Sequence, residues 1–167
     1  ITWVGDGNFS QTTGFDADGL MIWDDSVAWA GGLTIGGFTD WRLPTALNQN
    51  DSGPDLGYDI IGSEMGHLFY DELGSTAFNP VLGLFPNLQE SIYWSATELN
   101  TNGAWVFNFS TGHQGTVHKS FFDRYGLAVR DGDVAATAVP EPATIALLGI
   151  GLTGLAGGAV RRRLKKQ

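Results

Sequence analysis

The sequence predicts an α+β domain followed by one transmembrane helix, and three observations support this fold class. Two stretches with helical spacing, 24–33 and 63–73, lie in the first half of the chain. Between residues 92 and 130, apolar and polar residues alternate in short runs separated by turn residues, as in an antiparallel meander. An apolar run, 143–160, is then followed by five basic residues within seven positions. Helices that precede an antiparallel sheet are typical of the α+β class.

The first predicted helix, 24–33, has recognisable signals at both ends. Asp24 and Asp25 place carboxylates at the positive end of the helix, and the pair Gly31 and Gly32 closes it. Its apolar stripe consists of Trp23, Val27, Ala30 and either Trp29 or Leu33.

The second predicted helix, 63–73, is capped by Ser63 and ended by Gly74. We expect its inward face to carry Met65, Leu68, Phe69 and either Leu73 or Glu72. Another face carries Glu64, His67 and Asp71. Carboxylates and imidazole can bind zinc, but a solvated polar stripe predicts the same residues, and one helix supplies few fixed ligands.

The final third of the domain is predicted to be β-structure. Residues 92–97 and 104–110 form a hairpin around the turn 101–103. On the second of these strands, one face carries Trp105, Phe107 and Phe109, and the other carries Val106, Asn108 and Ser110. A short third strand is expected over 116–119. In the last strand we expect Arg130 to point outward, and inward-pointing side chains at Tyr125, Leu127 and Val129.

Charge and composition exclude several classes of function. Of the 18 Asp and Glu only Glu141 follows residue 138, whereas five of the nine Lys and Arg do, so residues 1–138 carry a net charge near −13. A nucleic-acid partner is not expected, because phosphate binding needs a basic surface. The chain has no Cys, which excludes disulfides and a thiol nucleophile.

Candidate binding residues fall in three places. Asp16 and Asp18 form part of a calcium-loop pattern, although the first ligand position holds Gly14, so calcium and a solvated turn both stay open. An aromatic ligand face that could stack on sugars has as candidates Tyr58, Tyr93 and Trp94. Arg42 is expected to be structural, held by a carboxylate such as Asp40 and by backbone carbonyls. No catalytic residue and no further cofactor is expected.

The C-terminal segment 139–167 combines three unlike parts in a fixed order. A Val-Pro-Glu-Pro box, 139–142, precedes the apolar run 143–160, which would span about 27 Å as a helix against a hydrocarbon core of about 30 Å. A basic tail, 161–167, would stay cytoplasmic, so the preceding domain would lie outside. An ordinary C-terminal anchor is the alternative interpretation.

This segment resembles the PEP-CTERM sorting signal, on the residues Val139, Pro140, Glu141, Pro142, Arg161, Arg162 and Arg163. The resemblance implies an exported bacterial protein whose partner is an exosortase, a membrane-embedded cysteine protease expected to cut near the Pro-Glu-Pro box. A precursor anchored in the inner membrane through 143–160 would then become a cell-surface or extracellular protein. It also implies an N-terminal export signal before Ile1.

The domain over 1–131, joined by a linker over 132–138, resembles the Lcl C-terminal-like family. The segment 37–45 (Gly-Phe-Thr-Asp-Trp-Arg-Leu-Pro-Thr) carries the likeness, together with 93–97, 105–112 and 125–130. Segment 63–74 resembles the subgroup with PEP-CTERM tails, although the Cys pair of that subgroup is absent here. The resemblance implies a C-type-lectin-like fold, with a first strand that would precede Ile1, and no settled function.

Three functions are weighed on this basis. A lectin-like module that binds an extracellular polysaccharide or another surface protein is the first hypothesis. A purely structural matrix or coat protein is the alternative. A hydrolase or other enzyme is the weakest, because no nucleophile-elbow sequence is present and the formylglycine-generating relatives of this fold rely on cysteines.

Overall fold

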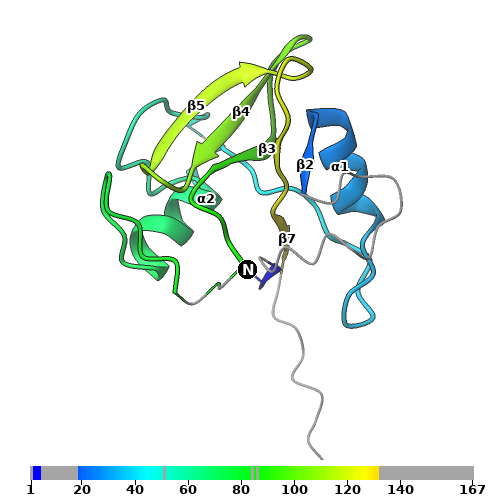
Figure 1. Cartoon of the computed structure of the whole chain (residues 1–167), viewed down its shortest axis with the longest axis horizontal. Coiled ribbons are helices and arrows are strands. Elements are labelled where there is room, and N and C mark those ends of the chain that lie inside the picture. The colour runs from blue at the N-terminus through cyan, green and yellow to red at the C-terminus, as the bar shows by residue number, and fades with distance from the viewer. Residues whose placement is uncertain (1, 5–18, 51, 84, 86, 132–167) are drawn as a thin grey trace, which may run out of the picture. The chain divides into compact units, whose positions relative to one another are not determined.

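The computed structural model describes residues 2–4, 19–50, 52–83, 85 and 87–131 (Figure 1). The chain divides after Asp133 into two units, and all of these residues belong to the first. Asp16, Asp18, the linker and the whole sorting segment lie outside the described residues. No helix within the described ranges is long and apolar enough to cross a bilayer, and the predicted span 143–160 is not among them.

The described elements confirm the α+β class. The helices are α1 (Trp23–Gly32), α2 (Glu64–His67) and η2 (Leu68–Glu72), where η2 is a π-helical turn that continues α2. Both predicted helices lie within one residue of their expected bounds, and the Ser63 hydroxyl accepts the Gly66 N–H as the predicted cap. The strands are β1 (Thr2–Val4), β2 (Leu20–Met21), β3 (Ile92–Asn100), β4 (Gly103–Asn108), β5 (His113–His118), β6 (Arg124–Tyr125) and β7 (Ala128–Arg130).

The larger sheet has the strand order β2-β6-β3-β4-β5 and is antiparallel except between β3 and β6. β3 and β4 form the predicted hairpin, with Tyr93 opposite Phe107. The third strand is longer than predicted, because Gly112, with a φ of 78°, completes the turn and lets β5 begin at His113. β7 is not part of this sheet and pairs with β1.

Both faces of the larger sheet are covered by apolar side chains. On one face, α1 supplies Trp23 and Trp29, which belong to the same core as Trp94. On the other, η2 places Phe69 against Phe107, with ring centroids 5.6 Å apart. Figure 1 shows α1 and α2 on opposite sides of β3 and β4. The predicted alternation along β4 therefore separates two apolar cores rather than a core from solvent.

The last strand departs from the prediction at Arg130. Leu127 and Val129 are buried as predicted, and Tyr125 is half-buried. Arg130 was expected to point outward, but it is only 7% exposed, because its guanidinium lies over the Phe38 ring and pairs with Asp40. The burial of Arg130 thus depends on the segment 37–45, which pairs with this strand through Arg42 and Val129.

Candidate functional site

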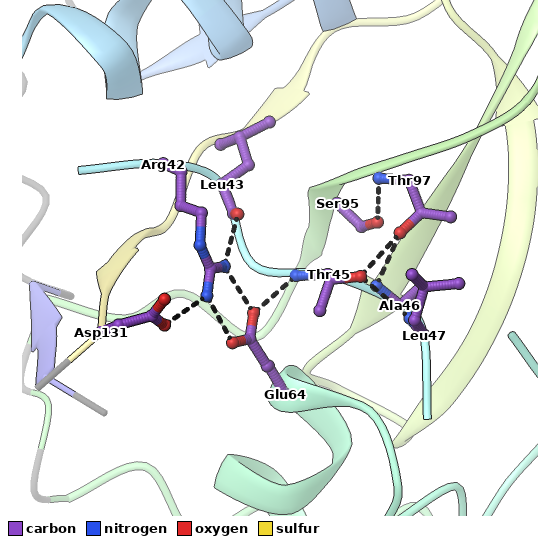
Figure 2. A network of polar contacts seen from close by, with 9 residues as sticks. All are labelled: Arg42, Leu43, Thr45, Ala46, Leu47, Glu64, Ser95, Thr97 and Asp131. Carbon is purple, nitrogen blue, oxygen red and sulfur yellow. Dashed lines mark hydrogen bonds and ion pairs between the residues drawn. The ribbon is translucent and has the colours of Figure 1, made fainter. Parts of the chain in front are cut away.

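A polar network joins the segment 37–45 to the start of α2 (Figure 2). The two terminal nitrogens of Arg42 each donate to one carboxylate oxygen of Glu64 at 2.8 Å. The same carboxylate accepts the Thr45 N–H at 2.6 Å. Glu64 is only 7% exposed, and these three donors offset the cost of burying its charge. The hydrogen bonds that Arg42 donates to Glu64 raise the pKa of Arg42 above its ordinary value.

Arg42 also fastens the end of the domain. Its Nη2 donates to Asp131 at 2.8 Å and its Nη1 to the Leu43 carbonyl at 3.2 Å, while its backbone pairs with Val129. These contacts agree with a structural role for Arg42, but the expected partner Asp40 is wrong. Asp40 instead accepts from Arg130 Nε at 2.9 Å, a hydrogen bond that lowers the pKa of the Asp40 carboxyl.

The polar face predicted for the second helix does not form a metal site. Glu64 points into the Arg42 network, whereas His67 Nδ1 contacts Asp71 at 2.9 Å on the exposed side. Among the residues that the structure describes, no group of three His, Cys, Asp or Glu side chains is placed to hold a metal ion. Asp16 and Asp18 are not among those residues.

Two of the three candidate ligand-face residues lie in the cores. Trp94 is 0% exposed, and its indole N–H donates to the Met21 carbonyl at 2.8 Å. Tyr93 is 2% exposed, and burial raises its pKa to about 12. Neither ring can stack on a ligand, because β3 is covered on both faces and its successive side chains enter different cores.

Tyr58 is the candidate that lies on the surface, and it does not stand alone. Its ring is 41% exposed and lies 5.1 Å from that of Phe78, which is 67% exposed. The half-buried imidazole of His113, at the start of β5, lies 4.9 Å from Tyr58. Three segments far apart in sequence thus place aromatic rings together at one end of β5.

Backbone hydrogen bonds fix the loops that carry these rings. Gly57 and Gln114 exchange both backbone hydrogen bonds, at 2.9 and 2.8 Å. The Asp59 N–H donates to the Tyr70 hydroxyl, which in turn donates to the Gly112 carbonyl. Since each loop is tied to β5 or to the turn before it, the rings are held in place before any ligand arrives.

The loop that carries Tyr58 also contributes to a polar pocket. It has a volume of about 390 Å³, and its walls come from the segments 48–52 and 55–62. Side-chain amides and carboxylates dominate the lining, which consists of Asn48, Gln49, Asn50, Ser52, Asp55, Asp59, Ile60, Ile61 and Gly62. Asp59 follows Tyr58 directly, so the pocket wall and the Tyr58 ring are neighbours along the chain. We call the three rings and this pocket the loop face.

The loop face also contains strained backbone. Asp59 and Phe78, with φ of 59° and 62°, are the two residues other than glycine with positive φ in the described part of the chain. A left-handed conformation costs an L-residue about 1–2 kcal/mol, and it is unusual for a bulky aromatic residue. Such strain concentrates at binding and catalytic sites, where it positions side chains.

A second exposed aromatic group lies at the other end of β5. Phe121 is 71% exposed and stacks on His118 with ring centroids 3.7 Å apart. Phe122 is 58% exposed and carries the Arg124 guanidinium over its ring. A pocket of about 360 Å³ reaches His118 at this end of β5, and its lining includes the side-chain amides of Asn100 and Asn102.

The sequence pattern indicates Tyr58 as a candidate, but it indicates neither Phe78 nor His113. Phe78 belongs to a connector in which aromatic and apolar residues abound, and its positive φ has no local sequence signal such as Gly or Asn. The closeness of Tyr58 to His113 depends on the Gly57–Gln114 bridge, which joins residues 57 positions apart. Such a contact follows from the tertiary fold and not from any motif.

Comparison with known proteins concerns the C-terminal segment. The model of the PEP-CTERM protein-sorting motif matches residues 138–163. This match covers the predicted Pro-Glu-Pro box, apolar run and arginine cluster, and it implies an exported protein that is membrane-anchored before an exosortase processes it. No curated protein matches the sequence.

Proposed function

We propose that the described domain is an exported, non-enzymatic glycan-binding module with a lectin-like fold, and that the loop face is its binding site. The observation that carries this proposal is the pair of exposed rings, Tyr58 and Phe78, together with a pocket of amides and carboxylates whose wall includes Asp59, the residue after Tyr58. The sorting motif supports an exported protein, which would meet polysaccharides outside the cell.

Each part of the loop face suits one part of a sugar. The face of an aromatic ring carries negative charge density, which attracts the C–H groups on the apolar side of a pyranose. Planar amide and carboxylate groups can bridge neighbouring hydroxyls, as Asn and Asp side chains do elsewhere. An exposed apolar group that is held rigidly and rimmed by polar groups is a common feature of binding surfaces.

The histidines support binding rather than catalysis. His67 contacts Asp71, and His113 packs edge-on against Tyr58. His118 lies 3.3 Å from the Ser120 hydroxyl, but its ring stacks on Phe121, and no carboxylate among the described residues contacts it. A serine nucleophile needs a histidine that contacts both the serine hydroxyl and an orienting carboxylate. Among the described residues, His67 contacts carboxylates but no serine hydroxyl, and His118 contacts a hydroxyl but no carboxylate.

Retention on native polysaccharide tests the proposal. The full chain, kept in micelles of a zwitterionic detergent without a sugar headgroup, is passed over extracellular polysaccharide from the producing cells. We expect retention of the unaltered protein and reduced retention of Tyr58→Ala and Phe78→Ala. Phe121→Ala is the matched control, because it removes an equally exposed ring from the opposite end of β5. Equal retention of all four proteins would contradict the proposal.

A structural matrix protein is the second candidate, and the exposed rings of Phe121 and Phe122 favour it. These rings could pack against another copy of the domain. Analytical ultracentrifugation would then show assembly that Phe121→Ala abolishes, and a monomer at all concentrations would exclude it.

A further inference from the structure

We infer that the ligand of the loop face is an uncharged polysaccharide and not a uronic-acid or sulfated polymer. This inference rests on the proposed function and specifies its ligand. Three observations support it: the charges of the segments that build the site, the ion pairs and ring contacts that the Lys and Arg side chains make elsewhere, and the hydrogen-bonding groups of the pocket wall.

The segments that build the loop face carry no strong cation. Between Leu43 and His118 the sequence contains eight Asp and Glu residues and no Lys or Arg. The pocket wall itself holds two carboxylates, Asp55 and Asp59. A polyanion would therefore meet like charges at short range and no compensating cation, which opposes binding at low ionic strength.

The four Lys and Arg residues of the domain are engaged elsewhere. Arg42 binds Glu64 and Asp131, and Arg130 binds Asp40. Of the remaining two, Lys119 follows the last residue of β5, and Arg124 begins β6, which is three strands away from β5 in the sheet. Lys119 contacts Glu98 at 2.8 Å and the Trp23 ring, and Arg124 lies over the Phe122 ring. His113 is the one basic side chain at the loop face.

The pocket wall offers hydrogen bonds that hydroxyl groups can use. The side-chain amide of Asn48 donates to Asp55 at 2.6 Å and to Ser52 at 3.0 Å, so only its oxygen is left to form a further hydrogen bond, as an acceptor. Carboxylates accept from sugar hydroxyls but cannot bind a second carboxylate or a sulfate without a proton or a cation. Beside the amides of Gln49 and Asn50, which both donate and accept, the wall thus offers the carboxylate acceptors of Asp55 and Asp59, which match a polymer that supplies O–H donors.

The affinity of the loop face would come from sugars that stack on its exposed rings and not from opposite charges. Tyr58 and Phe78 have their rings inclined by 39°, so the two faces together can follow adjacent residues of a chain. Ring stacking does not depend on salt, unlike attraction between opposite charges. Binding through the loop face should therefore be insensitive to ionic strength.

The test compares three polymers of matched chain length with the full chain in zwitterionic detergent micelles: a neutral β-glucan, a polyuronate and a sulfated dextran. Binding is measured by isothermal titration calorimetry at about 0.05 and 0.5 M salt, which changes the screening length from roughly 14 to 4 Å. We expect binding of the neutral polymer alone, with equal affinity at both salt concentrations.

Two variants locate the interaction. Tyr58→Ala and Phe78→Ala should each weaken binding of the neutral polymer by roughly three- to tenfold, as loss of one stacked ring predicts. Phe121→Ala should bind as the unaltered protein does. Circular dichroism confirms that each variant is folded before titration.

The outcomes separate this inference from the proposed function. Tighter binding of the polyuronate or the sulfated polymer, weakening with salt, would overturn the inference and leave glycan binding in place. Failure of all three polymers to bind would overturn both. Binding of the neutral polymer that neither Tyr58→Ala nor Phe78→Ala weakens would place the ligand elsewhere on the domain and also overturn the inference.

Discussion

Breaking the ion pair between Arg42 and Glu64 tests whether the segment 37–45 holds the fold or binds a ligand. The change is Glu64→Gln, which keeps the shape of the side chain and removes its charge. The substituted amide can still accept from the Thr45 N–H, but it loses one of the two charged hydrogen bonds with Arg42 (Figure 2). We expect a less stable domain whose loop face is intact.

The magnitude follows from the burial of the two partners. The side chain of Glu64 is 8% exposed and that of Arg42 is 37% exposed. Breaking a buried ion pair costs about 3–5 kcal/mol, whereas exposed pairs contribute about 0–1 kcal/mol. With one partner buried and the other in contact with water, Glu64→Gln should lower the free energy of unfolding by about 2–3 kcal/mol.

Urea unfolding, followed by tryptophan fluorescence on a chain ended at Thr137, measures this loss. A domain of this size loses about 1–3 kcal/mol per molar urea, so the midpoint should fall by roughly 1 M. Asp131→Asn is the matched control, because it alters a carboxylate that is 82% exposed and should change stability by less than about 0.5 kcal/mol. A double-mutant cycle with Arg42→Gln should give a coupling of about 1–3 kcal/mol.

Two results would refute the reasoning. A Glu64→Gln variant with the unfolding midpoint of the unaltered chain would show that the pair does not stabilise the fold. A variant of normal stability that no longer binds polysaccharide would make Arg42 and Glu64 part of the ligand site.

Three further predictions concern glycines, pH and strain. Gly112→Ala should destabilise the domain by more than about 2 kcal/mol, because the φ of Gly112 is 78° and the new Cβ would overlap the Tyr70 hydroxyl. Gly31→Ala in α1 places its Cβ within 4 Å of no atom and should stabilise the domain by about 0.5–1 kcal/mol. Thermal melts of the two variants measure both effects. The pKa of Tyr93 is about 12 in the folded domain and about 10 in the unfolded chain. The unfolded chain therefore loses its proton first, and the free energy of unfolding should fall by about 1.4 kcal/mol per pH unit between pH 10 and 12. The urea midpoint of Tyr93→Phe should depend less on pH over the same range. Phe78→Gly should relieve the strain of the positive φ at this residue. We expect an unchanged or higher urea midpoint together with weaker binding of polysaccharide. A large loss of stability would show that the Phe78 ring contributes to packing instead.

Local signals were sufficient to predict the helices and the hairpin. Ser63 caps α2, and Gly103 follows the turn of the β3–β4 hairpin, because both depend on contacts with residues nearby in the chain. Periodicity was less informative for β4, where Trp105, Val106 and Phe107 are all buried. A strand covered on both faces has no solvent side, so alternation reports which core a residue joins and not whether it is exposed.

Partners distant in sequence could not be predicted from the sequence. Asp40 was the nearest carboxylate to Arg42, yet Arg42 pairs with Glu64, and Asp40 pairs with Arg130. Arg42 and Asp40 have these distant partners because the segment 37–45 lies between α2 and β7, where the backbone of Arg42 pairs with that of Val129. The position of Phe78 beside Tyr58 likewise depends on a distant partner, because the Phe78 N–H donates to the Thr111 carbonyl.

We expect the same molecule to lose its C-terminal tail by processing and to bind glycan through the loop face. One measurement tests both expectations. Protein is eluted from the extracellular matrix of the producing cells with a neutral oligosaccharide, and its intact mass is determined. We predict that the sugar releases a protein whose mass excludes residues 161–167, as expected for an exported domain cut by an exosortase. Protein that keeps those residues, or matrix protein that the sugar does not release, would contradict an exported domain that binds glycan after processing.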